Sequence, residues 1–181
     1  MASVTGLTIE DFEKLPAALA RNHELVDGEL VDVSGNTLKH NRLRDNLIGL
    51  LRTLVEQRKL GEIISEQEFD FDGNAHGPDV SFVRAEKLSL LDPDLRVQRC
   101  VPDLAIEVVS QNDKVVALMK KARRYRKSGT REVWILHVEG REAFVLTNSQ
   151  SAILDDNDKF QSDLIPGFSI RLGDLFDDIS R

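Results

Sequence analysis

The stretch that decides the fold reads Pro102-Asp103-Leu104-Ala105-Ile106-Glu107-Val108-Val109, and a helical segment from Lys114 to Lys127 follows it. A second strand-like segment, His76-Gly77-Pro78-Asp79-Val80-Ser81-Phe82-Val83, precedes it. Each segment places an acid among β-forming residues, where burial of a carboxylate is costly without a partner or a metal ion. Two such acids with a cationic helix close behind indicate a divalent-metal site that includes a catalytic lysine.

Length and composition set the class of protein. A chain of 181 residues suits one sizeable core better than two, so we expect a single domain over residues 1–181. No apolar run approaches the ~20 residues of a membrane helix, and no basic-then-apolar signal opens the chain. We therefore expect a cytoplasmic protein without a membrane partner. The only cysteine, Cys100, cannot form an internal disulfide and argues against a thiolate zinc site.

The charge is unevenly distributed. The net charge is −7, yet eight of the 24 lysines and arginines lie between Lys114 and Arg131, a segment without an acid. A negative total argues against a protein that coats nucleic acid without specificity. The cationic segment suits a local phosphate-binding face, and it equally suits a solvated helix face that balances neighbouring acids.

The pattern of the whole chain predicts alternating helices and strands. Thr8 and Asp11 have the spacing of a capping box for a short helix. Asp27-Gly28 suits the turn of a hairpin between His23 and Val33. A stripe of leucines predicts a helix from about Thr37 to Lys59, with Gly61 as its C′ residue.

Further along the chain, the same reasoning predicts strands over residues 62–71, 79–83 and 103–109, a capping box at Ser110-x-x-Asp113, a helix to about Ser128, a hairpin over residues 131–147, and a weakly alternating tail over residues 160–170. Together these elements predict an α/β (α+β) fold, in which helices flank a central mixed β-sheet.

The two acids can meet only if their strands are neighbours. A magnesium ion commonly takes one or two carboxylates, together with waters and substrate phosphate. Asp79 begins one strand and Glu107 lies near the end of another, so strands ~4.8 Å apart would bring both carboxylates to one ion. Asp103 also follows a proline, but four strand residues separate it from Glu107 by ~13 Å. We therefore pair Asp79 with Glu107.

The helix that follows offers the lysine. With Leu118, Ala122 and Tyr125 as the buried stripe, Lys121 lies about 40° from Tyr125 and can reach inward. Lys114, seven residues earlier, lies on nearly the same side and could assist. A lysine beside a metal-bound water can orient the water and stabilise negative charge in the transition state. The alternative is a lysine at the helix margin that extends its ammonium group to solvent.

The sequence resembles the Uma-type restriction endonuclease family (DUF820-like) of the PD-(D/E)xK nuclease superfamily. The segments that carry the resemblance are Glu24-Leu25-Val26-Asp27-Gly28-Glu29, His40 at the start of a helix, Pro78-Asp79, the stretch from Pro102 to Ser110, Lys121 with Tyr125 and Gly129, and Glu132-Val133-Trp134. The resemblance covers roughly residues 8–175. It implies a restriction-endonuclease-like core and metal-dependent hydrolysis of phosphodiester bonds in DNA.

The resemblance also implies roles for single residues. Asp79 and Glu107 match the metal-binding acids, the Val108 carbonyl would complete the protein ligands, and the ion would be Mg²⁺ or Mn²⁺. Glu24 matches an upstream acid of many members, and Lys121 matches the helix lysine of the family. The superfamily signature has a lysine two residues after its second acid, where this chain has Val109. His137 likewise stands where the family often has an acid.

Several further expectations complete the hypothesis. We expect His40, Lys114 and Arg124 to contact nucleic acid. His76 precedes the Asp79 strand and could reach the metal site, but we interpret it as a loop histidine; we interpret Tyr125 as a core aromatic. Cutting a duplex requires two sites, so a homodimer is expected by analogy. Two alternatives stay open: a nucleic-acid-binding or assembly protein that keeps the fold without cleaving, and a hydrolase of small phosphate esters.

Overall fold

The computed structural model of the chain describes residues 6–20, 22–33, 35–109, 114–177 and 179. Its helices are α1 (Ile9–Glu13), α2 (Ala17–Ala20), α3 (Leu38–Arg58), α4 (Val115–Lys127), α5 (Leu172–Asp177) and the 3-10 helix η1 (Ala85–Leu90). The predicted capping box at Thr8 and Asp11 is present at the start of α1. The predicted box at Ser110 and Asp113 lies outside the described residues.

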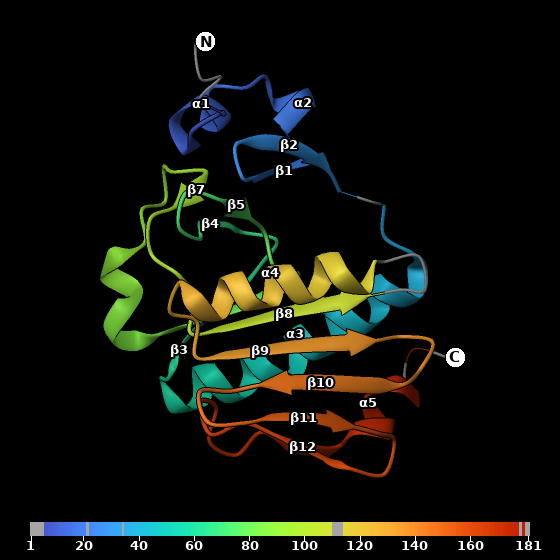
Figure 1. The fold of residues 1–181 in the computed structure, drawn as a ribbon. Helices are drawn as coiled ribbons and strands as arrows, with labels where there is room; N and C mark the ends of the chain where they lie inside the picture. Colours follow the sequence, from blue (N-terminus) through green and yellow to red (C-terminus); the bar gives the residue numbers. More distant parts are fainter. Residues whose placement is uncertain (1–5, 21, 34, 110–113, 178, 180–181) are drawn as a thin grey trace.

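A mixed sheet forms the centre of the fold. Among the described residues it has six strands, in the spatial order β11 (Ser151–Leu154), β10 (Glu142–Leu146), β9 (Glu132–His137), β8 (Leu104–Val109), β6 (Val80–Arg84) and β3 (Gly61–Ser65). The β8–β9 pair is parallel and the other pairs are antiparallel. Figure 1 shows α4 across one face of this sheet and α3 behind the other. The predicted central mixed sheet flanked by helices is confirmed.

The central strand β8 separates two apolar layers. All six of its residues are buried. Because side chains alternate between the faces of a strand, Leu104, Ile106 and Val108 pack in the cluster that includes the buried leucines of α3. Ala105 and Val109 pack with Tyr125 in the cluster on the α4 side. Glu107 has the parity of this second set, so its carboxylate points toward α4.

A smaller sheet lies beside the central one. Its order is β2 (Glu29–Asp32), β1 (His23–Val26), β5 (Ala75–His76), β4 (Glu68–Asp70) and β7 (Val97–Gln98). Asp27 and Gly28 join β1 to β2 with φ angles of 52° and 83°, as the predicted hairpin turn requires. A third sheet pairs β12 (Lys159–Gln161) with β13 (Ser169–Arg171).

Two predictions about element boundaries were wrong. Residues 62–71 do not form one strand, because Glu66 has a left-handed φ of 54° and the chain passes there from β3 in one sheet to β4 in the other. Gly61 does not end α3. Lys59 takes the left-handed C-cap conformation instead, and its N–H donates to the carbonyls of Val55 and Glu56, while Gly61 begins β3.

Gly61 is expected to tolerate no side chain. It has a φ of 151°, and a Cβ atom there would lie 2.0 Å from the Val83 carbonyl oxygen and 2.8 Å from the Arg84 Cα. Gly61→Ala should therefore destabilise the protein by about 2–4 kcal/mol, measured as the urea unfolding free energy. Gly49→Ala is the matched control: it lies within α3 with open space around its Cβ position, and should stabilise by about 0.5–1 kcal/mol. Equal unfolding free energies for the two variants would contradict the steric argument.

Candidate active site

Strand register brings Asp79 and Glu107 together. In the antiparallel β6–β8 pair, Val80 lies opposite Ile106, so the next position along the ladder places Asp79 opposite Glu107. Directly opposed residues of an antiparallel pair point to the same face. The Val108 N–H donates to Asp79 Oδ2 at 2.8 Å and holds this carboxylate against β8. The strands that carry the two predicted metal ligands are therefore neighbours.

Glu107 is a buried acid, with 8% of its surface exposed. Its Oε1 accepts a hydrogen bond from the Tyr125 hydroxyl at 2.6 Å and lies 3.1 Å from Lys121 Nζ. The net pKa of Glu107 is raised to about 7: burial is the largest cause and the charges of Asp79 and Glu24 add to it, while Lys121 and the hydrogen bond from Tyr125 oppose it. A cation beside this carboxylate would stabilise its ionised form.

Lys121 reaches from α4 to two carboxylates. Its Nζ lies 2.8 Å from Glu24 Oε1 as well as 3.1 Å from Glu107 Oε1. Burial lowers the pKa of Lys121, but the charges of Glu107 and Glu24 outweigh this effect and leave the pKa above its ordinary value. The lysine is therefore charged at neutral pH and lies between acids from two different sheets. Val109 stands at the position of the superfamily lysine, on the same face of β8 as Glu107, and packs in the cluster on the α4 side. In this chain the ammonium group on that side comes from Lys121 of α4.

Glu24 joins the site from the smaller sheet. Leu25 lies opposite Ala75 in the β1–β5 pair, so Glu24 falls opposite His76 at the next position. His76 Nδ1 lies 2.9 Å from Glu24 Oε2, and the Gly77 N–H donates to Oε1 at 3.3 Å. Burial raises the pKa of Glu24, but the charge of Lys121 and the contact with His76 outweigh it and bring the pKa to about 2. Glu24 is therefore an anion at all physiological pH values.

Sequence reasoning assigned no role in this cluster to two of its members, His76 and Tyr125. His76 is not in a loop: it lies in β5 and is 2% exposed. Tyr125 is a core aromatic, as interpreted, but its hydroxyl also contacts Glu107. The available signal for Tyr125 was its place on the same helix face as Lys121, one turn further along. For His76, the signal in the sequence was its position three residues before Asp79.

His40 contacts the first acid from the opposite side. It lies in the first turn of α3, and its Nε2 is 3.2 Å from Asp79 Oδ1. Burial lowers the pKa of His40, but the hydrogen bond and charge of Asp79 raise it by more, so the net shift is upward. Its Nδ1 is buried and has no hydrogen-bond partner among the described residues. His40 is therefore placed to hold the Asp79 carboxylate.

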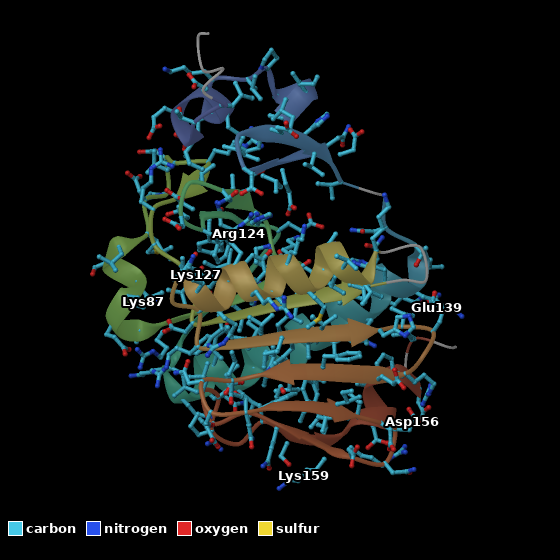
Figure 2. All side chains as sticks on the ribbon, in the orientation of Figure 1. Lys87, Arg124, Lys127, Glu139, Asp156 and Lys159 are labelled. Atoms are coloured by element: carbon cyan, nitrogen blue, oxygen red, sulfur yellow. The ribbon has the colours of Figure 1, made fainter. Side chains whose placement is uncertain are left out.

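These side chains line a cleft of about 1420 Å³ between the smaller sheet and α4. Arg124 and Lys114, two of the predicted nucleic-acid contacts, also line it. Figure 2 shows Arg124 extending from α4 toward the smaller sheet, where its Nη2 lies 2.8 Å from Asp27 Oδ1. The structure thus gathers every predicted site residue around one cleft.

The donor set suits a hard divalent cation. Asp79 and Glu107 provide carboxylate oxygens, and Val108 is next to Glu107 on the same strand. Within the part of the chain that the structure describes, no group of three or more His, Cys, Asp and Glu side chains is arranged to hold a metal. Magnesium needs only one or two protein carboxylates, because waters and substrate phosphate complete its octahedron. The raised pKa of Glu107 marks a site where a cation would offset crowded negative charge.

A restriction-endonuclease-like sheet with paired acids and a lysine at one cleft defines a nuclease-like class of protein. The chain belongs to the Uma2 family, described as "Putative restriction endonuclease", which it matches over residues 9–173. The structure is also similar to the crystal structure of a putative nuclease belonging to DUF820 from Anabaena variabilis ATCC 29413. The TM-score is 0.86 and the sequence identity 18%, over 96% of this chain and 99% of the other. This similarity shows the fold.

Comparison with curated proteins gave no match. No helix in the described ranges is long and apolar enough to cross a membrane.

Proposed function

We propose that the protein is a Mg²⁺- or Mn²⁺-dependent endonuclease that hydrolyses phosphodiester bonds in DNA. The observation that carries this proposal is the position of Lys121 Nζ, which lies 3.1 Å from Glu107 and 2.8 Å from Glu24. Glu107 in turn lies opposite Asp79 across the β6–β8 pair. Paired carboxylates with an adjacent ammonium group provide both a cation site and a fixed positive charge, which together suit metal-dependent hydrolysis of a phosphodiester.

Each residue of the proposed site has a separate role. Asp79, Glu107 and the Val108 carbonyl would hold the ion, which supplies Lewis-acid stabilisation of the phosphate and a water of lowered pKa. Lys121 places a positive charge where negative charge develops on the phosphate oxygens. Glu24 holds the Lys121 ammonium group in place through its 2.8 Å contact. His40, Lys114 and Arg124 are proposed to contact the DNA backbone.

DNA as the substrate is supported by the charge of α4. The helix and its flanks carry the chain's main basic segment, and Arg124, Lys120 and Lys114 line the same cleft as the acids. Cations along one face bind phosphates with a strong dependence on salt. We further propose that the protein acts in the cytoplasm as a homodimer, since two sites are needed to cut both strands of a duplex.

The direct test is Asp79→Ala in a cleavage assay on supercoiled plasmid with Mg²⁺, Mn²⁺ or EDTA. Cleavage should fall to the metal-free background, because the variant loses a carboxylate ligand while β6 and β8 stay paired. Asp163→Ala, which removes an exposed acid outside the cleft, is the matched control and should cleave like the wild type. Far-UV circular dichroism would establish that both variants are folded. Magnesium-dependent cleavage by Asp79→Ala at the wild-type rate would overturn the assignment.

A second candidate is a DNA-binding relative that does not cleave. Val109 at the superfamily lysine position and the net charge of −7 favour it. Fluorescence anisotropy with labelled duplex separates the two candidates: binding that weakens steeply with salt, with no cleavage under Mg²⁺ or Mn²⁺, would select the second.

A further inference from the structure

His76 lies between two side chains of the proposed site that come from different elements. Its Nδ1 is 2.9 Å from Glu24 Oε2 on β1, and its Nε2 is 3.1 Å from Arg124 Nη1 on α4. The ring is 2% exposed. It packs edge-on against Tyr125, with ring centroids 5.7 Å apart, and close to Phe71 at 6.0 Å. Packing therefore fixes the orientation of the ring, and both nitrogens meet charged groups.

The partners of the two nitrogens determine where the ring carries its proton. An arginine guanidinium has only donors, so His76 Nε2 must accept from Arg124 and cannot carry hydrogen. A carboxylate has only acceptors, so Nδ1 must carry hydrogen and donate to Glu24. Both contacts are satisfied together only by a neutral imidazole protonated at Nδ1. Burial lowers the pKa of His76 against the opposing effect of Glu24, which agrees with a neutral ring.

This arrangement has consequences on both sides of the ring. Donation to Glu24 Oε2 leaves Oε1 directed at Lys121, 2.8 Å away. On the other side, His76 and Asp27 occupy one N–H each of Nη1 and Nη2 of Arg124. The guanidinium has five N–H donors in a rigid plane, so its remaining N–H groups can donate to a phosphate in the cleft. One imidazole thus sets the direction of an acid beside Lys121 and of an arginine that lines the cleft.

We propose that His76 is a positioning residue that couples substrate binding by Arg124 to the alignment of Glu24 and Lys121, acting as a neutral, Nδ1-protonated imidazole. This inference rests on the proposed nuclease function for the roles of Glu24 and Arg124. It adds a residue that acts through Glu24 and Arg124, and each of its two hydrogen bonds serves a different step. Loss of the Nδ1 donor should impair turnover, and loss of the Nε2 acceptor should impair binding.

Two substitutions separate these hydrogen bonds. In His76→Asn, the side-chain amide nitrogen takes the position of Nδ1 and can still donate to Glu24, but it leaves Arg124 without its acceptor. In His76→Gln, the amide oxygen takes the position of Nε2 and can still accept from Arg124, but Glu24 loses its donor. Steady-state cleavage of a short duplex with Mg²⁺ should show kcat lowered about 10–100-fold in His76→Gln. His76→Asn should instead show a raised KM and a kcat close to that of the wild type.

The control is His137, a histidine at the end of β9 that is absent from the cleft lining. His137→Asn and His137→Gln should leave kcat and KM unchanged. Thermal melting should give similar midpoints for the two His76 variants, so that a difference between their kinetics reports position and not folding. The same loss of kcat in both His76 variants, or no loss in either, would overturn the proposal.

A spectroscopic measurement tests the state of the ring without any cleavage. The ¹⁵N chemical shifts of the imidazole nitrogens should identify a neutral His76 with hydrogen on Nδ1 at pH 7. Free histidine favours hydrogen on Nε2, so this result would not arise by default. Hydrogen on Nε2, or a charged ring, would overturn the proposal. Wild-type protein that fails to cleave DNA would instead contradict the proposed function, and the ¹⁵N shifts would still decide the state of His76.

Discussion

Glu107→Gln is expected to abolish cleavage and, at the same time, to make the metal-free protein more stable at pH 8. Cleavage is lost because an amide is a poor ligand for magnesium, which prefers charged oxygen. Stability is gained because burial and the charges of Asp79 and Glu24 raise the pKa of Glu107 to about 7. Ionised Glu107 therefore costs folding free energy at pH 8. Glutamine keeps the shape and can still accept the hydrogen bond from Tyr125.

The pH dependence of this gain has a definite sign. A carboxyl group whose folded pKa is raised destabilises the fold above that pKa, and has no effect below its unfolded pKa of 4.5. The cost grows from pH 4.5 to about 7 and is complete above pH 7. A shift of this size corresponds to at most about 3 kcal/mol. Urea unfolding in EDTA should therefore show a large gain for Glu107→Gln at pH 8 and almost none at pH 4.

The control for Glu107→Gln is Glu139→Gln, at an exposed position in the β9–β10 turn. It should change the unfolding free energy by less than about 0.5 kcal/mol at either pH. Magnesium provides a second comparison: it should raise the melting temperature of the wild type, by mass action on the folded state, and leave that of Glu107→Gln unchanged. A Glu107→Gln protein less stable than wild type at pH 8 would contradict the argument.

The main acids could be predicted from the sequence because their signal is local. A strand of β-formers interrupted by one acid predicts a buried carboxylate, and Glu107 lies in a strand that is buried throughout. The helical period placed Lys121 at the edge of a buried stripe, and in the structure it reaches inward to Glu107. Both inferences depend on residues within one element, where side-chain periodicity is reliable.

The histidines could not be assigned in this way, because their partners are remote in sequence. His76 and Glu24 are 52 residues apart and meet only because β1 pairs with β5. His40 lies in α3 and Asp79 directly precedes β6, so their contact also joins two elements that are separated in the sequence. A lone histidine carries no periodic signal, and its role depends on which side chain the tertiary fold brings to it.

The boundaries that were wrong have a similar cause. The chain passes from one sheet to the other at Glu66, which has a left-handed φ. A glycine would have indicated such a conformation in the sequence, but a glutamate does not. In the tail, short strands β11 to β13 and the helix α5 follow one another between Ser151 and Asp177. Elements of three to six residues are too short to show a clear hydrophobic period. β11 is instead held as the edge strand of the central sheet, and tail residues such as Phe160 and Leu172 pack in the apolar cluster on its α3 side.

Lys121→Met is expected to damage both activity and stability. Methionine retains much of the aliphatic stem but removes the only ammonium group in contact with Glu24 and Glu107 among the described residues. Cleavage should fall about 10²–10³-fold, the range for loss of one group that stabilises transition-state charge. Stability at pH 8 should fall by about 3–5 kcal/mol, because a buried charge loses its partner. Lys127→Met, an exposed lysine at the end of the same helix (Figure 2), should change neither quantity.

A double variant separates the lost charge pair from a general loss of packing. If Lys121→Met destabilises because Glu107 is left without a cation, adding Glu107→Gln removes the stranded charge, and the double variant should be more stable at pH 8 than Lys121→Met alone. The two effects are then strongly non-additive, as expected for residues in direct contact. A purely steric effect of methionine would persist in the double variant. Unfolding free energies of the four proteins at pH 8 in EDTA measure this coupling, and a coupling near zero would mean that Lys121 and Glu107 do not act as the charged pair on which the proposed chemistry depends.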